Sequence, residues 1–201
     1  GVQTCALPIF RRLDENVTDN STAADPRFAG LLEFTRTRLN DLDARALISL
    51  LHCCSHVRAV PPAAWMDAFW EASRAKLLSL DPHALSNTLW ACGKLNRTPP
   101  ASWMQAFSKA TTAALSRFTD QGIANTLHAC TLLALWTSPI VAPLWHTLES
   151  RMLSARQTPE SDVLLGQMHL FFLSSLIGRH GTFSFRDPSL LARAKQVRRS
   201  Y

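Results

Sequence analysis

The chain has 201 residues, of which 47% are hydrophobic and 18% charged, and its formal net charge is +6. This composition argues against a disordered or coiled-coil chain, and the seven glycines and single tyrosine argue against an all-β fold. No apolar run approaches the ~20 residues that a bilayer-spanning helix needs, so no membrane partner is expected. The positive charge suits a polyanionic partner.

Residues 1–25 are predicted to lie outside the folded part. The opening, Gly1 to Ile9, looks like the translation of a sequencing-library adapter, and we exclude it from reasoning about the fold. Residues 11–25 are rich in Asn, Thr, Ser and Asp, which is typical of a flexible lead-in. We therefore expect the natural chain to begin upstream of Phe10. We also expect it to continue beyond Tyr201, which ends a basic helical pattern.

The central part of the sequence is repetitive. Residues 61–98 and 99–136 align without a gap at a shift of 38, with sixteen identical positions. The same shift continues upstream, and downstream a shift of 41 aligns His128 with His169. A repeat of this length indicates a stack of similar structural units with degenerate ends. The predicted array covers 26–178, with units near 26–60, 61–98, 99–138 and 139–178.

The first half of each unit is predicted to be a helix. A Pro-Pro pair, at Pro61 in one unit and Pro99 in the next, opens it, because a missing N–H is harmless at a helix start. In the 61–98 unit, Trp65, Phe69 and Ala72 follow at i, i+4 and i+7, which places them on one face. We expect these side chains to be buried in the core.

A second helix is predicted to follow, with Asp81 as its N-cap and Pro82 at its first position. Leu85, Leu89 and Cys92 form its apolar face. A single pair of helices cannot bury both of its apolar faces, so neighbouring pairs must stack. The predicted fold class is therefore all-α, a right-handed α-solenoid of about four helix-turn-helix repeats with a concave groove.

The remaining segment, 179–201, is predicted to be a linker and a basic terminal helix. Asp187 is the expected cap and Pro188 the first helical residue. The helix carries a cluster of basic side chains that is either a solvated face or a phosphate contact. The cluster consists of Arg193, Lys195, Arg198 and Arg199.

A polar face lies opposite the apolar face of each second helix. In the 61–98 unit it carries His83, Asn87, Trp90 and Lys94. The equivalent residues of the neighbouring units are Ser49, His52, His56, Gln121, Asn125 and His128.

These side chains suit single-stranded RNA. One position of the face always holds a ring that can stack on a base, for about 1–3 kcal/mol per base. Asn87 and Asn125 suit hydrogen bonds to base edges, and Lys94, Arg58 and Arg97 suit contacts to phosphates. The ring position is occupied by His52, Trp90, His128 and His169. The candidate RNA-binding residues are His52, Asn87, Trp90, Lys94, Asn125, His128, Arg193, Lys195, Arg198 and Arg199.

The same residues also admit purely structural interpretations. The repeated Asn-Thr pair, at Asn87 and Asn125, is equally compatible with a ladder of hydrogen bonds between units. Trp90 is equally compatible with packing between units.

The motifs themselves resemble those of a known family. Pro-Pro-x-x-Trp-Met-x-x-Phe begins at Pro61 and Pro99, and an Asn-Thr-Leu-(Trp/His)-Ala-Cys core begins at Asn87 and Asn125. This pattern resembles the octotricopeptide repeat family, whose 38-residue unit has a Pro-Pro-x-x-Trp start and an Asn-Thr-Leu-Trp-Ala-Leu core. The resemblance covers about 28–178. The fourth unit departs from it, with Gly166 and Gln167 in place of Asn and Thr.

The resemblance implies sequence-selective binding of single-stranded RNA in mitochondria or chloroplasts, chiefly of green algae. Members of the family act in the maturation, stability or translation of transcripts, and some are structural components of mitochondrial ribosomes that bind rRNA. Residues 187–201 also look like the stretch that leads into a RAP domain in such proteins. Other proteins of a ribonucleoprotein assembly are therefore expected partners.

Catalytic and metal-binding patterns are weak. His52-Cys53-Cys54-Ser55-His56 resembles a metal cluster, but Cys54 recurs as Cys92 and Cys130 on the apolar face, where it fills space as a small hydrophobe. No glycine-rich phosphate loop or Gly-x-Ser-x-Gly elbow occurs. We therefore expect no enzymatic activity, cofactor or metal in this chain.

Two other functions remain open at this stage. One is a protein–protein scaffold of HEAT-like type, which predicts apolar or acidic side chains in the groove. The other is an adaptor for a RAP-type domain beyond Tyr201.

Overall fold

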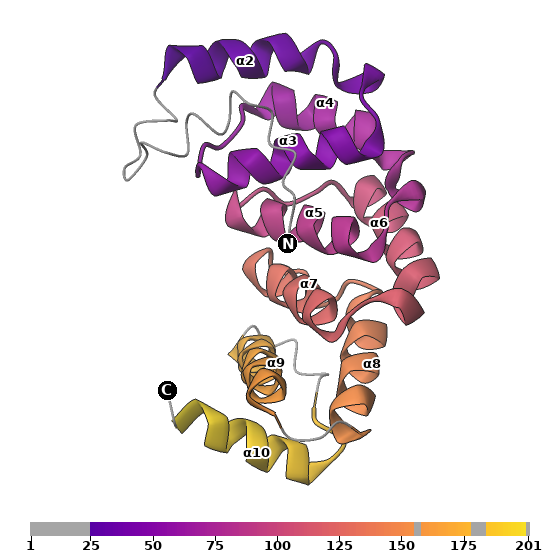
Figure 1. Ribbon diagram of the computed structural model, residues 1–201, viewed down its shortest axis with the longest axis vertical. Helices are drawn as coiled ribbons and strands as arrows, with labels where there is room; N and C mark the ends of the chain where they lie inside the picture. Colours follow the sequence, from indigo (N-terminus) through magenta and orange to yellow (C-terminus); the bar gives the residue numbers. More distant parts are fainter. Residues whose placement is uncertain (1–24, 155–157, 178–183, 200–201) are drawn as a thin grey trace.

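A computed structural model describes residues 25–154, 158–177 and 184–199 of the chain (Figure 1). All regular secondary structure in these ranges is helical, which confirms the all-α prediction. The α-helices are α2 (Pro26–Arg36), α3 (Ala44–His56), α4 (Ala63–Arg74), α5 (Pro82–Lys94), α6 (Ala101–Ala114), α7 (Asp120–Leu132), α8 (Val141–Ser154), α9 (Pro159–Ile177) and α10 (Pro188–Arg199). The predicted lead-in before residue 25 lies outside the described residues.

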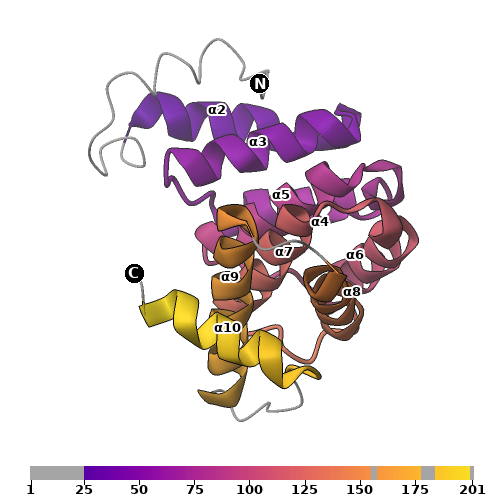
Figure 2. The ribbon, with the colours of Figure 1, turned by 60° about the horizontal axis from the view of Figure 1, so that its bottom comes forward.

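The helices follow one another down the long axis of the molecule (Figure 1). The second helix of each pair packs on the next one in chain order, α3 on α5, α5 on α7 and α7 on α9. The first helices α2, α4 and α6 also pack in chain order, and α10 packs on α9, which it crosses in Figure 2. Contacts therefore run mainly between neighbours in the stack.

Helix starts in the described residues follow the local sequence. Asp43, Asp81 and Thr119 stand 38 residues apart in the chain, and each caps a second helix. Their side chains accept hydrogen bonds from the backbone N–H of the third residue of the helix, at 2.7, 2.7 and 3.1 Å. The prediction for Asp81 and Pro82 is confirmed. Such caps satisfy backbone donors that the helix itself leaves unpaired.

Short 3-10 helices connect the two helices of the first three pairs, a feature that the sequence patterns did not predict. They span Leu39–Asp41, Leu77–Ser79 and Leu115–Arg117. Each begins with a leucine 38 residues from the next, and Leu39 and Leu77 are fully buried. The connection therefore packs into the core.

The turns after α3, α5 and α7 each contain a residue with positive φ. Arg58, Asn96 and Ala134 have φ of 52°, 50° and 55° and again stand 38 residues apart. In each turn the next N–H donates back to the carbonyl of a cysteine, at 3.1, 3.0 and 2.8 Å, which closes the helix end. Because a Cβ is disfavoured at positive φ, Arg58 and Ala134 hold a strained conformation.

Replacing Ala134 by Gly is therefore expected to stabilise the protein by about 0.5–1 kcal/mol, since relief of strain exceeds the added freedom of the unfolded chain. Urea unfolding followed by circular dichroism measures the change. The matched control is Ala129→Gly, at a buried position inside α7, which is expected to destabilise by about 1 kcal/mol. Equal losses for both variants would contradict the strain.

Two buried tryptophans join successive first helices. Trp65 and Trp103 are 1% and 0% exposed and stack on Phe69 and Phe107, as the helical spacing predicts. The indole N–H of Trp65 donates to Thr35 Oγ1 at 3.0 Å, and that of Trp103 donates to Ser73 Oγ at 2.9 Å. Both acceptors lie on the preceding first helix, so the same contact occurs at two successive interfaces.

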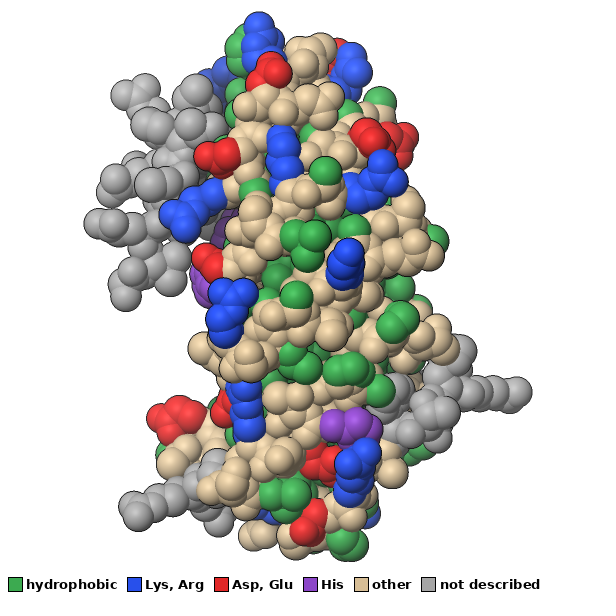
Figure 3. All heavy atoms as spheres, turned by 90° about the vertical axis from the view of Figure 1, so that its right-hand side faces the viewer, with side chains coloured by type: hydrophobic (Ala, Val, Ile, Leu, Met, Phe, Trp, Pro, Cys, Tyr) green, Lys and Arg blue, Asp and Glu red, His purple; other side chains and the backbone are tan. Residues whose placement is uncertain are grey.

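The surface on the side of α6 and α8 shows Lys and Arg side chains interspersed with Asp and Glu along the long axis (Figure 3). Among the residues that the structure describes, no helix combines the length and hydropathy of a bilayer-spanning segment.

Candidate nucleic-acid interface

A cluster of rings lies between α3 and α5. The His52 ring centroid is 4.4 Å from that of His56 and 5.9 Å from that of Trp90. Lys94 Nζ lies 5.4 Å from the centre of the Trp90 ring. His52 and Trp90 are half-buried, whereas His56 and Lys94 are exposed. The structure thus brings together three of the predicted residues, His52, Trp90 and Lys94. We call the side chains of His52, His56, Trp90 and Lys94 the ring cluster.

The imidazoles of His52 and His128 favour the neutral form. Burial lowers the pKa of His52, and the neighbouring His56 and His83 lower it further. Burial also lowers the pKa of His128 on α7, and the ammonium of Lys94 lowers it further. At neutral pH the rings of His52 and His128 are therefore uncharged surfaces near the Lys94 ammonium, an arrangement that suits stacking on bases next to a phosphate.

A pocket of about 300 Å³ opens between the N-terminal halves of α5 and α7. Both predicted asparagines line it. The Asn87 amide nitrogen lies 3.3 Å from the nearest His83 ring nitrogen, and Gln121 Nε2 donates to Asn125 Oδ1 at 2.7 Å. Each bond uses only part of the capacity of its amide, so both side chains can still donate and accept hydrogen bonds. The lining residues are Asp81, Pro82, His83, Ser86, Asn87, Arg117, Phe118, Thr119, Gln121, Gly122 and Asn125.

The two halves of the repeated Asn-Thr pair have different environments. Thr88 and Thr126 are fully buried, and each hydroxyl donates to a carbonyl of its own helix, at 2.6 and 2.8 Å. Asn87 and Asn125 are only half-buried, and their hydrogen bonds also stay within one helix. The threonines thus act in the core, while the asparagines face the pocket.

Several pocket residues were not among the predicted ones. Arg117 and Phe118 come from the 3-10 connection before α7. Ser86 Oγ donates to Gly122 O at 3.0 Å and so joins α5 to α7. Periodicity within one helix cannot find such residues, because the connection and α7 meet α5 only through packing.

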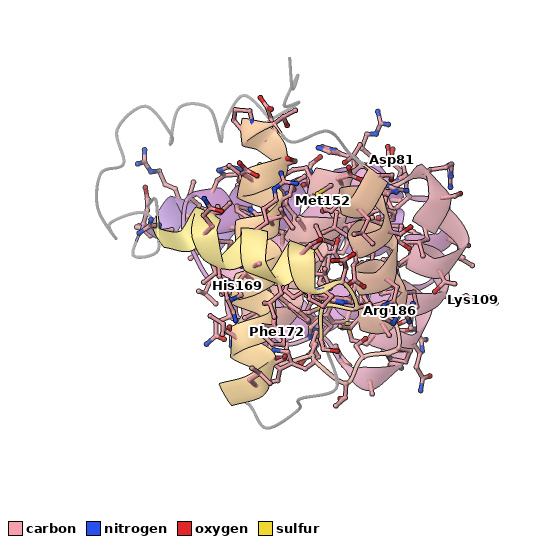
Figure 4. The ribbon with its side chains drawn as sticks, turned by 90° about the horizontal axis from the view of Figure 1, so that it is seen from below. Asp81, Lys109, Met152, His169, Phe172 and Arg186 are labelled. Atoms are coloured by element: carbon pink, nitrogen blue, oxygen red, sulfur yellow. The ribbon has the colours of Figure 1, made fainter. Side chains whose placement is uncertain are left out.

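The ring series does not continue into α9. The prediction that His169 occupies the ring position is wrong, because His169 is 4% exposed and stacks on Phe172 at 6.3 Å (Figure 4). The next residue, Leu170, is 52% exposed instead. Val163 and Leu176 of the same helix are also exposed, each 46%. The surface of α9 is therefore more apolar than the surfaces of α5 and α7.

The basic residues of α10 lie beyond α9, at the end of the stack (Figure 1). Asp187 accepts from Ser189 N at 2.7 Å, which confirms the predicted cap. Arg193 forms an ion pair with Asp162 and donates to Ser161 Oγ, so its guanidinium joins α10 to α9. Lys195 is exposed. The side chains of Arg198 and Arg199 lie outside the described part.

Two arginines proposed for phosphate contact also have defined positions. Arg97 is half-buried, and one of its Nη atoms donates to Pro61 O at 3.4 Å. Arg58 is exposed on the turn after α3. Of these two, Arg58 is the more accessible to a ligand.

The recurrent cysteines face the core. Cys54, Cys92 and Cys130 are all fully buried, and burial raises the pKa of Cys54 and of Cys130 to about 12 and that of Cys92 as well. Cys53 is only half-buried. Within the described residues, no group of three or more His, Cys, Asp or Glu side chains is arranged to hold a metal ion.

Of these four cysteines, only Cys53 is expected to react with a thiol reagent in the folded protein, because the thiolate is the reactive form and burial suppresses it. A Cys53→Ser variant should then show none of this fast labelling. Mass mapping of labelled peptides, with a urea-unfolded sample as the reference for full reaction, measures it. Fast labelling of Cys92 in folded protein would contradict the burial.

Comparison with known proteins gives no independent assignment. No protein-family model matches the chain, and no curated protein matches it significantly.

Proposed function

We propose that this chain binds single-stranded RNA along the face formed by α3, α5 and α7. The observation that carries the proposal is the presence, on the packed helices α3, α5 and α7, of the ring cluster, the amide-lined pocket and the exposed His128. Rings, amides and a lysine are the side-chain types that hold single strands by stacking, base-edge hydrogen bonds and phosphate contacts.

The fold that we propose for this function is a right-handed α-solenoid with a 38-residue repeat. Four features that recur at intervals of 38 support it: the caps, the 3-10 connections, the positive-φ turns and the indole hydrogen bonds. On this proposal α3, α5 and α7 line the inner groove, and a strand runs across successive second helices.

The pocket sets how bases would be read. Asn87 and Asn125 line the same pocket from two neighbouring units. A base in the pocket therefore contacts both helices, and its edge meets one amide from each of them. Selectivity then depends on pairs of units rather than on single ones.

The proposed setting is a ribonucleoprotein of a mitochondrion or chloroplast, in which the chain is a binding module without catalytic activity. The resemblance of the repeat motifs supports this setting. An RNA strand bound across three second helices contacts only a few bases, so partners in the same assembly would add to the affinity.

The test is binding of fluorescein-labelled oligo(U) and oligo(A), each about 12 nucleotides long, measured by anisotropy. We expect single-stranded RNA to bind more tightly than an RNA duplex of the same length, and affinity to fall between about 50 and about 200 mM salt. Binding that is absent at low salt, or that prefers the duplex, would overturn the proposal.

A protein partner is the second candidate, and the exposed apolar residues of α9 favour it. Val163, Leu170 and Leu176 are each close to half exposed, whereas the polar face of α7 carries Asn125 and His128. On this alternative the α9 surface docks another protein. Substituting Leu170 by Gln would then abolish that association and leave RNA binding unchanged.

A further inference from the structure

Histidines are concentrated on the proposed RNA-binding face. His52 and His56 lie side by side on α3, His83 lies beside Asn87 on α5, and His128 is exposed on α7. His52 and His56 both contact Trp90, and Lys94 lies over the same indole. A ligand on Trp90 would therefore touch groups whose charge changes with pH.

In the free protein, no carboxylate among the described groups contributes to the pKa shift of His52 or His128, so none favours their protonated forms. Lys94 is the cation that faces His128, and His56 and His83 face His52. Three acidic side chains on neighbouring elements have arginine partners. Asp81 has Arg45 within 4.0 Å, and Asp120 and Asp162 form ion pairs with Arg151 and Arg193.

We infer that RNA binding at this face is coupled to proton uptake, so that affinity rises as the pH falls from about 7.5 to about 5.5. The inference rests on the proposed function and adds its regulation. In the free protein, burial disfavours the protonated forms of His52 and His128, and the neighbouring His56 and His83 (for His52) and Lys94 (for His128) disfavour them further. A phosphate beside them supplies the opposite charge, so the bound state takes up protons that the free state does not hold.

The expected size of the effect follows from counting charges. Each additional phosphate contact on a single strand steepens the slope of log affinity against log salt by about 0.7. If His52, His56 and His128 all become charged in the complex, the slope steepens by about 2 between the two pH values. We expect affinity for RNA to rise at least tenfold near about 100 mM salt.

The folding stability of the free protein has the opposite pH dependence. His52 and His128 have pKa values below the ordinary value of 6.5, so the unfolded chain binds protons more readily than the folded chain below neutral pH. Stability therefore falls as the pH drops through that range. A gain in binding on acidification would thus occur despite a loss of stability, which separates the two effects.

The experiment measures binding of oligo(U), whose bases do not titrate in this range, to the full chain at about pH 7.5 and about pH 5.5. Helical circular dichroism at both pH values verifies folding. The variant His52→Gln/His56→Gln/His128→Gln is expected to lose the tenfold difference. Lys94→Gln is expected to bind more weakly at both pH values and to keep most of the difference, because the three histidines remain. His146→Gln, a change on α8 outside this face, is the matched histidine control and should also keep it.

Calorimetry gives a second readout, because titrations in buffers of different ionisation enthalpy count the protons taken up on binding. We expect about one to three protons near pH 6.5 for the unmodified chain and fewer than one for the triple variant. Equal affinity at both pH values, or a triple variant that keeps the difference, would overturn proton coupling and leave RNA binding intact. No binding at either pH would overturn the proposed function itself.

Discussion

Replacing Trp103 by Ala is expected to destabilise the protein by about 3–5 kcal/mol, the range for removing a large buried aromatic side chain. The Trp103 side chain is 0% exposed, stacks on Phe107 with ring centres 5.2 Å apart and contacts Trp70 edge-on. Its removal leaves a cavity between α4 and α6 and takes away the indole bond to Ser73. Because domains of this size are stable by only about 5–15 kcal/mol, the variant should unfold at much lower urea concentration.

Two further variants separate the effect of the cavity from that of the lost hydrogen bond in the destabilisation caused by Trp103→Ala. Trp103→Phe keeps most of the ring and loses the N–H donor, so it is expected to cost about 1–3 kcal/mol. Phe34→Ala removes an aromatic side chain that is 58% exposed, and we expect a cost below about 1 kcal/mol. Urea unfolding monitored by circular dichroism compares the three. Equal urea midpoints for Trp103→Ala and Phe34→Ala would contradict the structural role of the Trp103 side chain.

Replacing Trp90 by Ala is expected to weaken RNA binding by about 1–3 kcal/mol, or roughly five- to 150-fold in Kd. Trp90 is half-buried, and its ring meets His52 and His56 on one helix and Lys94 on its own. Truncation removes the stacking surface and also the ring beneath the Lys94 ammonium. The dissociation constant for oligo(A) at fixed salt measures the loss.

The chain itself supplies a matched control for Trp90. The position equivalent to Trp90 is His128 in the next unit and His52 in the preceding one, so Trp90→His keeps a stacking ring in a tolerated place. We expect Trp90→His to retain most of the affinity that Trp90→Ala loses. The free energies of unfolding of the two variants should differ by less than about 1.5 kcal/mol. If both bind RNA as tightly as the unmodified chain, Trp90 has a packing role only.

Local signals predicted the helices well. Asp81 and Pro82 start α5, Pro99 and Pro100 precede α6, and Asp187 and Pro188 start α10, because caps and proline act within one turn of the helix. The burial of Leu85, Leu89 and Cys92 also followed from spacing, since a helix places these residues on one face. Neither result required knowledge of the neighbouring helices.

The candidate site was predictable in composition and less so in extent. The repeat identified Asn87, Trp90 and Asn125 as members of one polar face, and all three are partly accessible. It misplaced His169, because a shift of one residue turns a side chain by about 100° around the helix axis. The packing of α9 on α7 and α10 selects Leu170 for the surface instead.

The amino-acid sequence alone determined the helical class of the described residues and their caps, breaks and buried faces, which interactions over a few residues set. Packing between helices decided the rest: the pocket that pairs Asn87 with Asn125, the contact of His52 with Trp90, and the commitment of Arg193 to Asp162. The physical reason is range. Caps and helical spacing act within a turn or two, whereas these contacts join residues about 30 or more positions apart, whose distances depend on how whole helices pack.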